Sequence, residues 1–442
     1  MTDFLRSETS STTPSLSELT LVFARIGLLS FGGPAGQIGM MHRVIVDEKR
    51  WLSEERFLHA LNYCMLLPGP EAQQLATYAG WLLHGRRGGI IAGTLFILPG
   101  FLVIVALASA YALYQDTHWL PALLFGLKAG VLAIVIEALL RVAKRALTSR
   151  FLVGVAAAAL IALFFFAVPF PLVILGAGIA GFLRARGRQT PEASAADDQP
   201  KMLSLKRRLG GALVGVAIWQ IPLLLAWLFA APQTLVDLQG FFSKLAVVTF
   251  GGAYAVLAYV AQVVVETHGW MTATEMLDGL ALAEATPGPL VLVLSYIGFL
   301  AAFRHPGGLE PMLAGVLGAS IAAWATFVPS FIFIFLGAPY VERLRNNAAL
   351  SGALSAITGA VVGVILNLSV WFGLHVLFGK VDRVELLPAI NLGISLPQWQ
   401  TLDLASLGLF VVSAVMLFRL KLSMVPVLGL CIAAGLVRLW LA

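Results

Sequence analysis

The chain is poor in charged residues and in cysteine, and each shortage excludes a class of protein. Of its 442 residues 12% are charged and 59% are hydrophobic, and the mean hydropathy is +0.89. This composition excludes an ordinary soluble globular protein. The two cysteines, Cys64 and Cys431, lie in apolar stretches. We therefore expect them to pack in the interior, and we expect neither disulfide chemistry nor thiolate–metal binding.

Sequence motifs of catalytic and metal sites are missing as well. The seven histidines show no metal-ligand spacing, and the chain has no HExxH, GxSxG or P-loop sequence. We therefore expect no enzyme activity, no metal and no cofactor. The net charge of +6 is concentrated in a few loops, which indicates membrane orientation and not nucleic-acid binding. Residues 1–16 are polar and lack the pattern of a cleaved secretory signal.

What the chain has in abundance is apolar runs of about twenty residues, each long enough to cross a bilayer as a helix. Its landmarks occur twice. Phe31-Gly32-Gly33, Trp51 and Pro68-Gly69-Pro70 return at an offset of 219 as Phe250-Gly251-Gly252, Trp270 and Pro287-Gly288-Pro289. Further along, the offset becomes 230 and pairs Pro99 with Pro329 and Glu137 with Asn367. A duplicated apolar chain predicts a membrane transporter built from two repeats.

We predict an all-α polytopic membrane protein with two inverted repeats. The expected organisation is a polar tail (1–16), a first repeat (17–183), a cytoplasmic linker (184–208), a connecting transmembrane helix (209–231) and a second repeat (235–442). The first repeat is expected to contain Leu19–Val46, Leu58–Leu83, Gly88–Tyr114, Leu120–Leu140 and a pair within Phe151–Leu183. The second is expected to contain Leu238–Val265, Leu277–Ala302, Pro311–Leu336, Leu350–Phe378, Leu404–Leu420 and Ser423–Leu441. Six segments return the chain to the side of the membrane on which it started. One extra transmembrane helix therefore makes the second repeat start on the opposite side, which inverts its topology.

The distribution of cations tests the inversion. Loop 141–150 carries Arg141, Lys144, Arg145 and Arg150, and it should face the cytoplasm together with the N-terminus and the linker. The turn 115–119 has no cation, whereas its counterpart in the second repeat carries Arg343 and Arg345, as inversion requires. Lys380 and Arg383 fall on the predicted outer side and are exceptions to the rule.

The loop after the first segment of each repeat breaks simple alternation. The conflict disappears if the Gly/Pro-bearing segments are re-entrant hairpins, with limbs of about 10–14 residues. We predict four broken or re-entrant elements whose tips converge at the membrane midplane. The alternative is a set of kinked helices that cross the membrane fully. Trp51 and Trp270, which end these loops, are expected to be interfacial anchors.

The Gly/Pro tips suit an anion. Glycine lets the backbone approach a ligand, and Pro34 and Pro70 suit the first position of a helix. The amides of Gln37, Glu71 and Gln73 would then lie at helix N-termini, where amide groups and the helix dipole favour negative charge. The alternative is that these residues only kink transmembrane helices.

Several ionisable residues lie within apolar segments, where each costs about 2.5–3.5 kcal/mol on insertion scales. Arg25 and Lys244 share one repeat position and suit a doubly charged anion, although pairing with Glu71 or Glu284 alone is also open. Glu71 and Glu284 are candidates for carrying a coupling proton, because burial raises a carboxyl pKa towards the working pH. We expect Lys128 and Glu137 to have structural partners, and Glu137 is a third candidate for proton coupling.

Three motifs carry a family resemblance: Ser30-Phe31-Gly32-Gly33-Pro34, Leu67-Pro68-Gly69-Pro70-Glu71-Ala72-Gln73-Gln74 and Ala283-Glu284-Ala285-Thr286-Pro287-Gly288-Pro289. They resemble the chromate ion transporter family in its long, duplicated form, over about residues 15–440. The resemblance implies a bacterial inner-membrane exporter of chromate, with sulfate as the look-alike anion and export coupled to the proton motive force. It carries functional roles to Phe31, Gly32, Gly33, Pro34, Pro68, Gly69, Pro70, Glu71, Phe250, Gly251, Gly252, Pro287, Gly288 and Pro289. Ala253 departs from the pattern, since the first repeat has Pro34 there.

The membrane potential favours export of such an ion. A dianion leaving a negative-inside cell gains about 4.6 kcal/mol per 100 mV. Chromate and sulfate are both tetrahedral dianions, so a sulfate or other oxyanion exporter or exchanger is an alternative, and an anion channel is another. Sequence sets neither the oligomeric state nor the proton stoichiometry.

Overall fold

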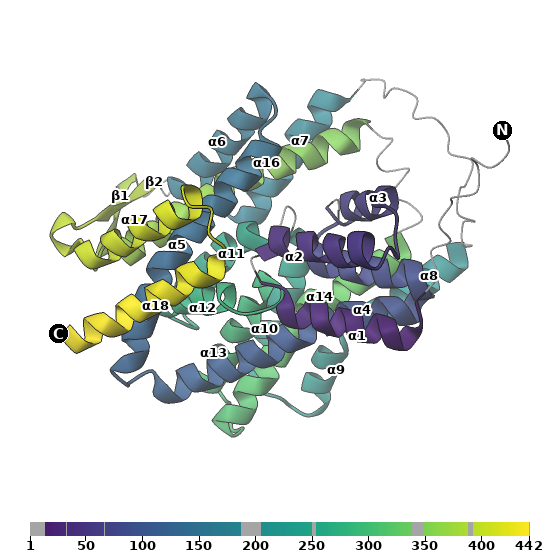
Figure 1. Ribbon diagram of the computed structural model, residues 1–442, viewed down its shortest axis with the longest axis horizontal. Coiled ribbons are helices and arrows are strands. Elements are labelled where there is room, and N and C mark those ends of the chain that lie inside the picture. Colours follow the sequence, from purple (N-terminus) through teal and green to yellow (C-terminus); the bar gives the residue numbers. More distant parts are fainter. Residues whose placement is uncertain are drawn as a thin grey trace.

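The computed structural model describes residues 14–31, 33–65, 67–186, 205–249, 253–337, 348–387 and 392–441, and almost all of its regular structure is helical. Figure 1 shows the arrangement. The first half contains α1 (Leu16–Leu29), α2 (Gly33–His42), the π-helical turn η1 (Arg43–Glu48), α3 (Glu54–Cys64), α4 (Glu71–Tyr114), α5 (Trp119–Ala146), α6 (Arg150–Phe164) and α7 (Phe170–Ala185).

The second half begins with α8 (Leu205–Trp219) and α9 (Ile221–Leu228). It continues with α10 (Gln233–Val248), α11 (Ala253–Gln262), the π-helical turn η2 (Val263–Thr267), α12 (Ala273–Glu284), the short 3₁₀ helix η3 (Leu290–Leu292), α13 (Val293–Arg304), α14 (Pro311–Gly337) and α16 (Ala348–Leu377). It ends with strands β1 (Val381–Leu387) and β2 (Leu392–Pro397), the 3₁₀ helix η6 (Trp399–Thr401), α17 (Leu404–Phe418) and α18 (Met424–Leu441).

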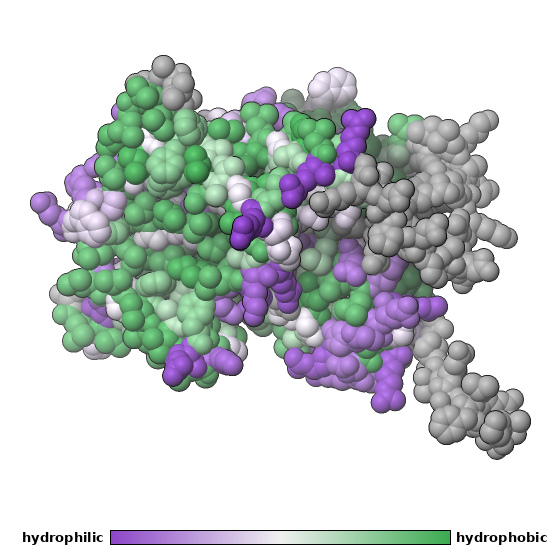
Figure 2. Space-filling view, turned by 90° about the horizontal axis from the view of Figure 1, so that it is seen from above, coloured by the Kyte–Doolittle hydropathy of each residue, from purple (hydrophilic) through white to green (hydrophobic). Residues whose placement is uncertain are grey.

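The outer surface is that of a membrane protein. Within the described chain, five helices are long and apolar enough to cross a bilayer, namely α4, α5, α14, α16 and α18. Large apolar side chains face outwards: Leu21, Trp227 and Phe229 expose 73%, 79% and 75% of their surface. Figure 2 shows the same pattern, with hydrophobic residues over most of the visible face and hydrophilic residues in a few patches. The chain is therefore an all-α polytopic membrane protein.

Helices end at the glycine motifs of both halves. α1 stops before Ser30 and α10 before Thr249, and α2 and α11 follow as pieces of 10 residues each. In each half a π-helical turn then follows directly. Pieces of 10 to 16 residues are too short to cross the hydrocarbon core at 1.5 Å per residue. The breaks therefore lie where we expected them, and a re-entrant course through the bilayer stays a prediction.

The break predicted between the segments Leu58–Leu83 and Gly88–Tyr114 is present. It lies within α4 at His84 and Gly85, where the backbone is not helical, and Gly80 packs against Gly88 across it. The predicted end of the fourth segment differs from the structure. α5 continues to Ala146, so Arg141, Lys144 and Arg145 lie on a helix and not in a loop.

The connecting segment 209–231 was predicted as a single helix, and this was wrong. It consists of α8 and α9, which meet at an angle of 51°. Pro222 causes the bend, because its ring clashes with the carbonyl of Ile218 and it has no N–H to donate. The carbonyls freed by the bend find side-chain donors. Trp324 Nε1 donates to Ile218 O and to Trp219 O (3.2 Å each), and Gln239 Nε2 donates to Trp219 O (3.1 Å).

An antiparallel β-hairpin between α16 and α17 was not predicted. Arg383 lies opposite Ser395 in its register, and an isolated bridge from Phe378 to Leu402 closes its base. β1 is almost wholly exposed, so its sequence shows no period of buried residues that would have predicted a strand.

The two halves exchange their packing partners. α5 of the first half packs against α17 and α18 of the second, and α16 of the second half packs against α6 and α7 of the first. Small residues permit the close approach: a Cβ on Gly126 would clash with Cys431 O, and one on Gly181 would clash with Gly352 O. Each half therefore completes the other.

α5 and α16, which are equivalent in the two repeats, also touch each other. Val131 and Val135 of α5 line one narrow gap together with Leu368 and Phe372 of α16, and Gly373 lies beside Leu132. The middle of α5 therefore meets the C-terminal half of α16.

Trp51 and Trp270 are not interfacial anchors, which corrects our expectation. Each is 6% exposed, and each belongs to a hydrophobic core. Their backbone N–H groups bond to Ile45 O (2.8 Å) and Val264 O (3.0 Å), which ties each tryptophan to the π-helical turn before it. The chain turns inwards there, so the indole rings are covered by protein.

Candidate functional site

The proline-glycine-proline segment of each half bonds to the glycine motif of the other half. Gly288 N–H donates to Ser30 O (2.8 Å), and Gly69 N–H donates to Thr249 O (2.8 Å). Both donors and both acceptors are separated by 219 residues, so the two bonds are copies of one contact. Reciprocal contacts of this kind are what a two-fold axis between the two halves would produce.

Only glycine fits at the two donor positions. Gly69 has φ +122° and Gly288 has φ +92°, which L-residues rarely adopt. A Cβ on Gly69 would lie 2.7 Å from Gln74 Nε2 and 2.8 Å from Ser330 Oγ. In the other copy Gly100, the repeat equivalent of Ser330, packs directly against Gly288. The place where these two contacts lie is called the crossing below, and it is tightly packed at both Gly69 and Gly288.

Glu284 lies beside this crossing, and it is 4% exposed. Tyr254 OH donates to Glu284 Oε1 (3.2 Å). The first half reaches the same spot: a Cβ on Gly33, which has φ +65°, would lie 3.5 Å from Tyr254 OH and 4.0 Å from Glu284 Oε1. Gln37 Nε2 donates to Gly288 O (2.6 Å) and holds the two tips together. The structure thus joins three of the predicted site residues, Gly33, Gln37 and Gly288, to Glu284.

The start of α4 forms the other side of the site. Pro70 is the N-cap and Glu71 the first helical residue, one position later than we predicted, and no side chain caps the free amides. Gln73 Nε2 donates to Thr77 Oγ1 (2.9 Å), and Gln74 Nε2 donates to Pro68 O (2.7 Å). The amide oxygens of both glutamines are buried without a partner among the described residues. Uncapped amides at a helix N-terminus suit an anion, whereas the two unpartnered amide oxygens suit a hydrogen-bond donor such as water.

Positive charge comes from the C-terminal turns of α5. Glu137 forms an ion pair with Arg141 four residues later. Lys144 and Arg145 add two further cations in the last turn of α5. Of the three predicted proton-coupling candidates, Glu137 therefore has an α5 arginine as its ion-pair partner. We missed these arginines by assigning them to a loop, although positions 137, 141 and 145 recur on one helix face.

Other predicted residues lie elsewhere or outside the described chain. Arg25 and Lys244 are on the exposed faces of α1 and α10, and neither has a hydrogen bond or ion pair within the described chain. Pro287 and Pro289 lie in the buried crossing, and Phe31 and Pro34 are half-buried beside it. The remaining predicted residues, which lie outside the described ranges, are Gly32, Phe250, Gly251 and Gly252.

A second buried polar cluster was only half predicted. Lys128 Nζ lies 3.0 Å from Asp278 Oδ1, and Tyr111 OH donates to Asp278 Oδ2 (3.0 Å). The partner of Lys128 is therefore Asp278, which sequence reasoning overlooked. The three residues of the cluster line a pocket of about 320 Å³, together with Glu275. Within the described residues no group of His, Cys, Asp and Glu side chains could hold a metal ion.

Broken helices that meet inside a polytopic membrane protein, with buried carboxylates and nearby arginines, define a membrane transport protein. The chain matches the chromate transporter family over residues 17–182 and 236–436, and it belongs to that family.

Its relatives agree with this assignment. A probable chromate transport protein of Synechococcus elongatus is 31% identical over 87% of this chain and 92% of its own length. The chromate transport protein of Cupriavidus metallidurans is 29% identical (80% and 81%), and that of Pseudomonas aeruginosa is 32% identical (79% of each). No solved structure matches the chain.

Proposed function

We propose that the protein exports chromate across the bacterial inner membrane as a secondary active transporter and so confers chromate resistance. The observation that carries the proposal is the reciprocal bonding of Ser30 with Gly288 and of Gly69 with Thr249. It brings the helix breaks of both halves together, next to the uncapped start of α4 and to Glu284, inside a member of the chromate transporter family. The relatives named above as chromate transport proteins support the choice of substrate.

In this proposal the oxyanion binds between the two crossing tips. The groups offered to it are the free amides at Glu71 and Gln73, the side-chain amide of Gln73 after rotation about its last bond, and the field of Arg141 and Arg145. Gln37, Gly69 and Gly288 keep the tips in place. Glu71, Glu284 and Glu137 are the groups proposed to carry a coupling proton.

The membrane orientation is part of the proposal. The linker 184–208 and the N-terminus face the cytoplasm, the segment 209–231 connects the halves, and the repeats 17–183 and 235–442 are inverted. The α5 arginines then lie towards the cytoplasm and the β-hairpin towards the outside. A dianion moving outwards gains about 4.6 kcal/mol per 100 mV, which is about three decades of concentration.

The test is chromate flux through purified protein in proteoliposomes. A potassium diffusion potential sets the voltage, a proton gradient is applied separately, and sulfate is added as a competitor. We expect saturable chromate flux that responds to voltage and to the proton gradient. Stronger flux of sulfate than of chromate would favour the sulfate exporter or exchanger. Flux that does not saturate and ignores the proton gradient would favour a channel.

A further inference from the structure

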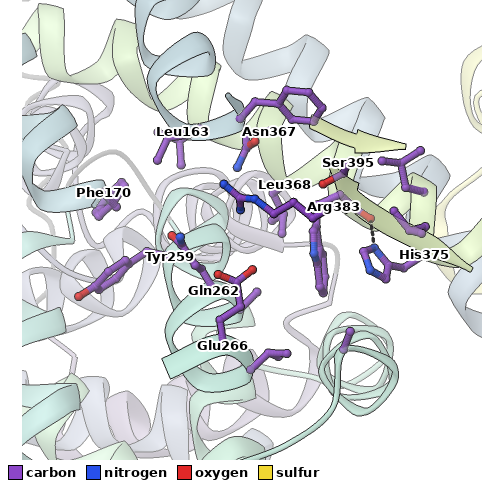
Figure 3. Close-up of a pocket in the computed structure, with 18 residues that line it drawn as sticks. Leu163, Phe170, Tyr259, Gln262, Glu266, Asn367, Leu368, His375, Arg383 and Ser395 are labelled. Carbon is purple, nitrogen blue, oxygen red and sulfur yellow. Dashed lines mark hydrogen bonds between the residues drawn. The ribbon is translucent and has the colours of Figure 1, made fainter. Parts of the chain in front are cut away.

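A second polar cavity, of about 210 Å³, lies apart from the crossing tips. Its walls come from α11 and η2, from the C-terminal half of α16, from the α6–α7 turn and from the β-hairpin (Figure 3). α11 begins at the crossing, where Tyr254 bonds to Glu284, and the cavity is lined by residues farther along the chain, Tyr259, Gln262 and Glu266. The cavity contains none of the residues in the proposed binding site.

The hairpin presents one cation and one hydroxyl to this cavity. Arg383 and Ser395 are opposite each other in the β-register, so their side chains share one face of the hairpin. Figure 3 shows the Arg383 side chain reaching across the cavity towards Asn367, with Gln262 beyond it. Arg383 has no ion pair within the described chain, although the carboxylate of Glu266 lines the same cavity. A guanidinium without a carboxylate partner is therefore available to a ligand.

The remaining polar walls are mostly neutral groups that can donate hydrogen bonds. Asn367 and Gln262 supply amide groups, and Ser395 supplies a hydroxyl. A guanidinium combined with neutral donors suits a tetrahedral oxyanion, which accepts hydrogen bonds on several oxygens at once. Asn367 occupies the repeat position of Glu137, and Gln262 that of Arg43, so the second repeat has neutral donors where the first has charges.

We propose that this cavity is an exit site, which holds the oxyanion briefly after it leaves the crossing tips and before it reaches the outside. The proposal rests on the proposed function. Arg383 attracts the dianion, and Asn367, Gln262 and Ser395 hydrogen-bond to it. Glu266 repels the dianion and keeps the affinity low, as release from a transport pathway requires.

The experiment measures inhibition from the outer side. Proteoliposomes of known protein orientation export chromate, and the outer concentration of chromate that halves net export is compared between variants. The variants are Arg383→Gln, Arg383→Lys and Glu266→Gln. The matched control is Lys380→Gln, which removes an exposed cation next to the same hairpin that does not line the cavity. Size-exclusion profiles show that each variant is folded.

We expect R383Q to raise the half-inhibiting outer concentration by about tenfold or more, as loss of a charged hydrogen-bonding partner predicts. R383K should recover part of the effect, E266Q should lower the concentration, and K380Q should leave it unchanged. The inner-side KM should stay within about twofold of wild type. Equal behaviour of R383Q and K380Q, or no opposite effect of E266Q, would overturn the exit site. Absence of chromate flux in the wild type would instead overturn the proposed function.

Discussion

Gly288 donates its main-chain N–H to the carbonyl oxygen of Ser30 over 2.8 Å, and this bond joins the two halves of the chain at their helix breaks. Its copy, from Gly69 to Thr249, has the same length. The two bonds fix how far the tips can separate. Any motion that opens a path for the substrate must break one of them or carry both halves together.

The first prediction concerns the glycines of this contact. Gly69→Ala and Gly288→Ala place a Cβ at a positive φ, which costs about 1–2 kcal/mol before any clash. At Gly69 the Cβ also clashes with Gln74 and Ser330. We expect both variants to unfold at lower temperature and to lose transport. Gly240→Ala, at an open helical position, is the control and should be neutral or slightly stabilising. Thermal unfolding in detergent measures all three, and wild-type behaviour of G69A would contradict the tight crossing.

The second prediction concerns Glu284. Glu284→Gln keeps the size of the side chain and a hydrogen bond with Tyr254, but it cannot carry a proton. We expect a folded protein whose chromate flux is reduced by about tenfold or more and no longer depends on the proton gradient. Tyr254→Phe removes the hydrogen bond and leaves the carboxyl group, so it should retain gradient dependence. Proton-driven flux in E284Q at the wild-type rate would remove Glu284 from the coupling mechanism.

The third prediction concerns the buried pair of Lys128 and Asp278. Side chains of the two residues are 18% and 6% exposed, so removal of one partner leaves the other charge with little water. Lys128→Met or Asp278→Asn alone should destabilise the protein by about 3 kcal/mol. The double variant should lose less than the sum of the two. A double-mutant cycle on unfolding temperatures tests this, and strict additivity would show that the two charges do not stabilise each other.

The fourth prediction concerns Asp403, which caps α17 outside the membrane-spanning helices. Partial burial opposes its ionisation, but the Ser406 N–H and the Arg438 guanidinium prevail and lower the pKa of Asp403 below 3.8. A lowered folded-state pKa contributes stability that is complete above the unfolded pKa and is lost as the pH falls through the folded value. Acidification below about pH 4 should therefore lower the unfolding temperature of the wild type more than that of Asp403→Asn. Parallel pH profiles of the two proteins would contradict this.

The fifth prediction concerns Arg25 and Lys244, which are exposed cations at one repeat position. If they attract the dianion without holding it, Arg25→Gln and Lys244→Gln should slow export at low ionic strength by up to about tenfold. The difference should shrink in high salt. Arg56→Gln, another exposed cation, is the control. Complete loss of export at every salt concentration would place the two side chains in the binding site itself.

The sequence was sufficient to predict features that are caused by composition or by residues close to one another in the chain. Composition set the membrane class, and the glycine and proline motifs marked where α1, α10 and α4 begin or end. It failed where the cause lies in tertiary contact. The bend at Pro222 is stable because Trp324 and Gln239 supply donors from other helices, and the partner of Lys128 is 150 residues away. Nothing local to either residue indicates these contacts.

The candidate site could be predicted only in part, because its contacts also depend on tertiary structure. The 219-residue offset identified Gly69 and Gly288 as equivalent, but it could not show that each bonds to the other half. Arg25 and Lys244 looked like site residues because a cation in an apolar segment is unusual. Their helix faces, which depend on how α1 and α10 pack, turn them outwards instead. Arg141 and Arg145 were assigned to a loop, and only the full extent of α5 places them on a helix, where Arg141 pairs with Glu137.

The exchanged packing of α5 and α16 implies something about how such a chain could arise. A single repeat would lack the surface that its own α5 or α16 needs, so it would be incomplete alone and would need a second copy of itself. An ancestral protein of half this length would then have worked as a pair. Fusion through α8 and α9 would have made that pairing permanent and left each half free to diverge. Such divergence is visible at equivalent positions, where the first repeat has Arg43 and Glu137 and the second has Gln262 and Asn367.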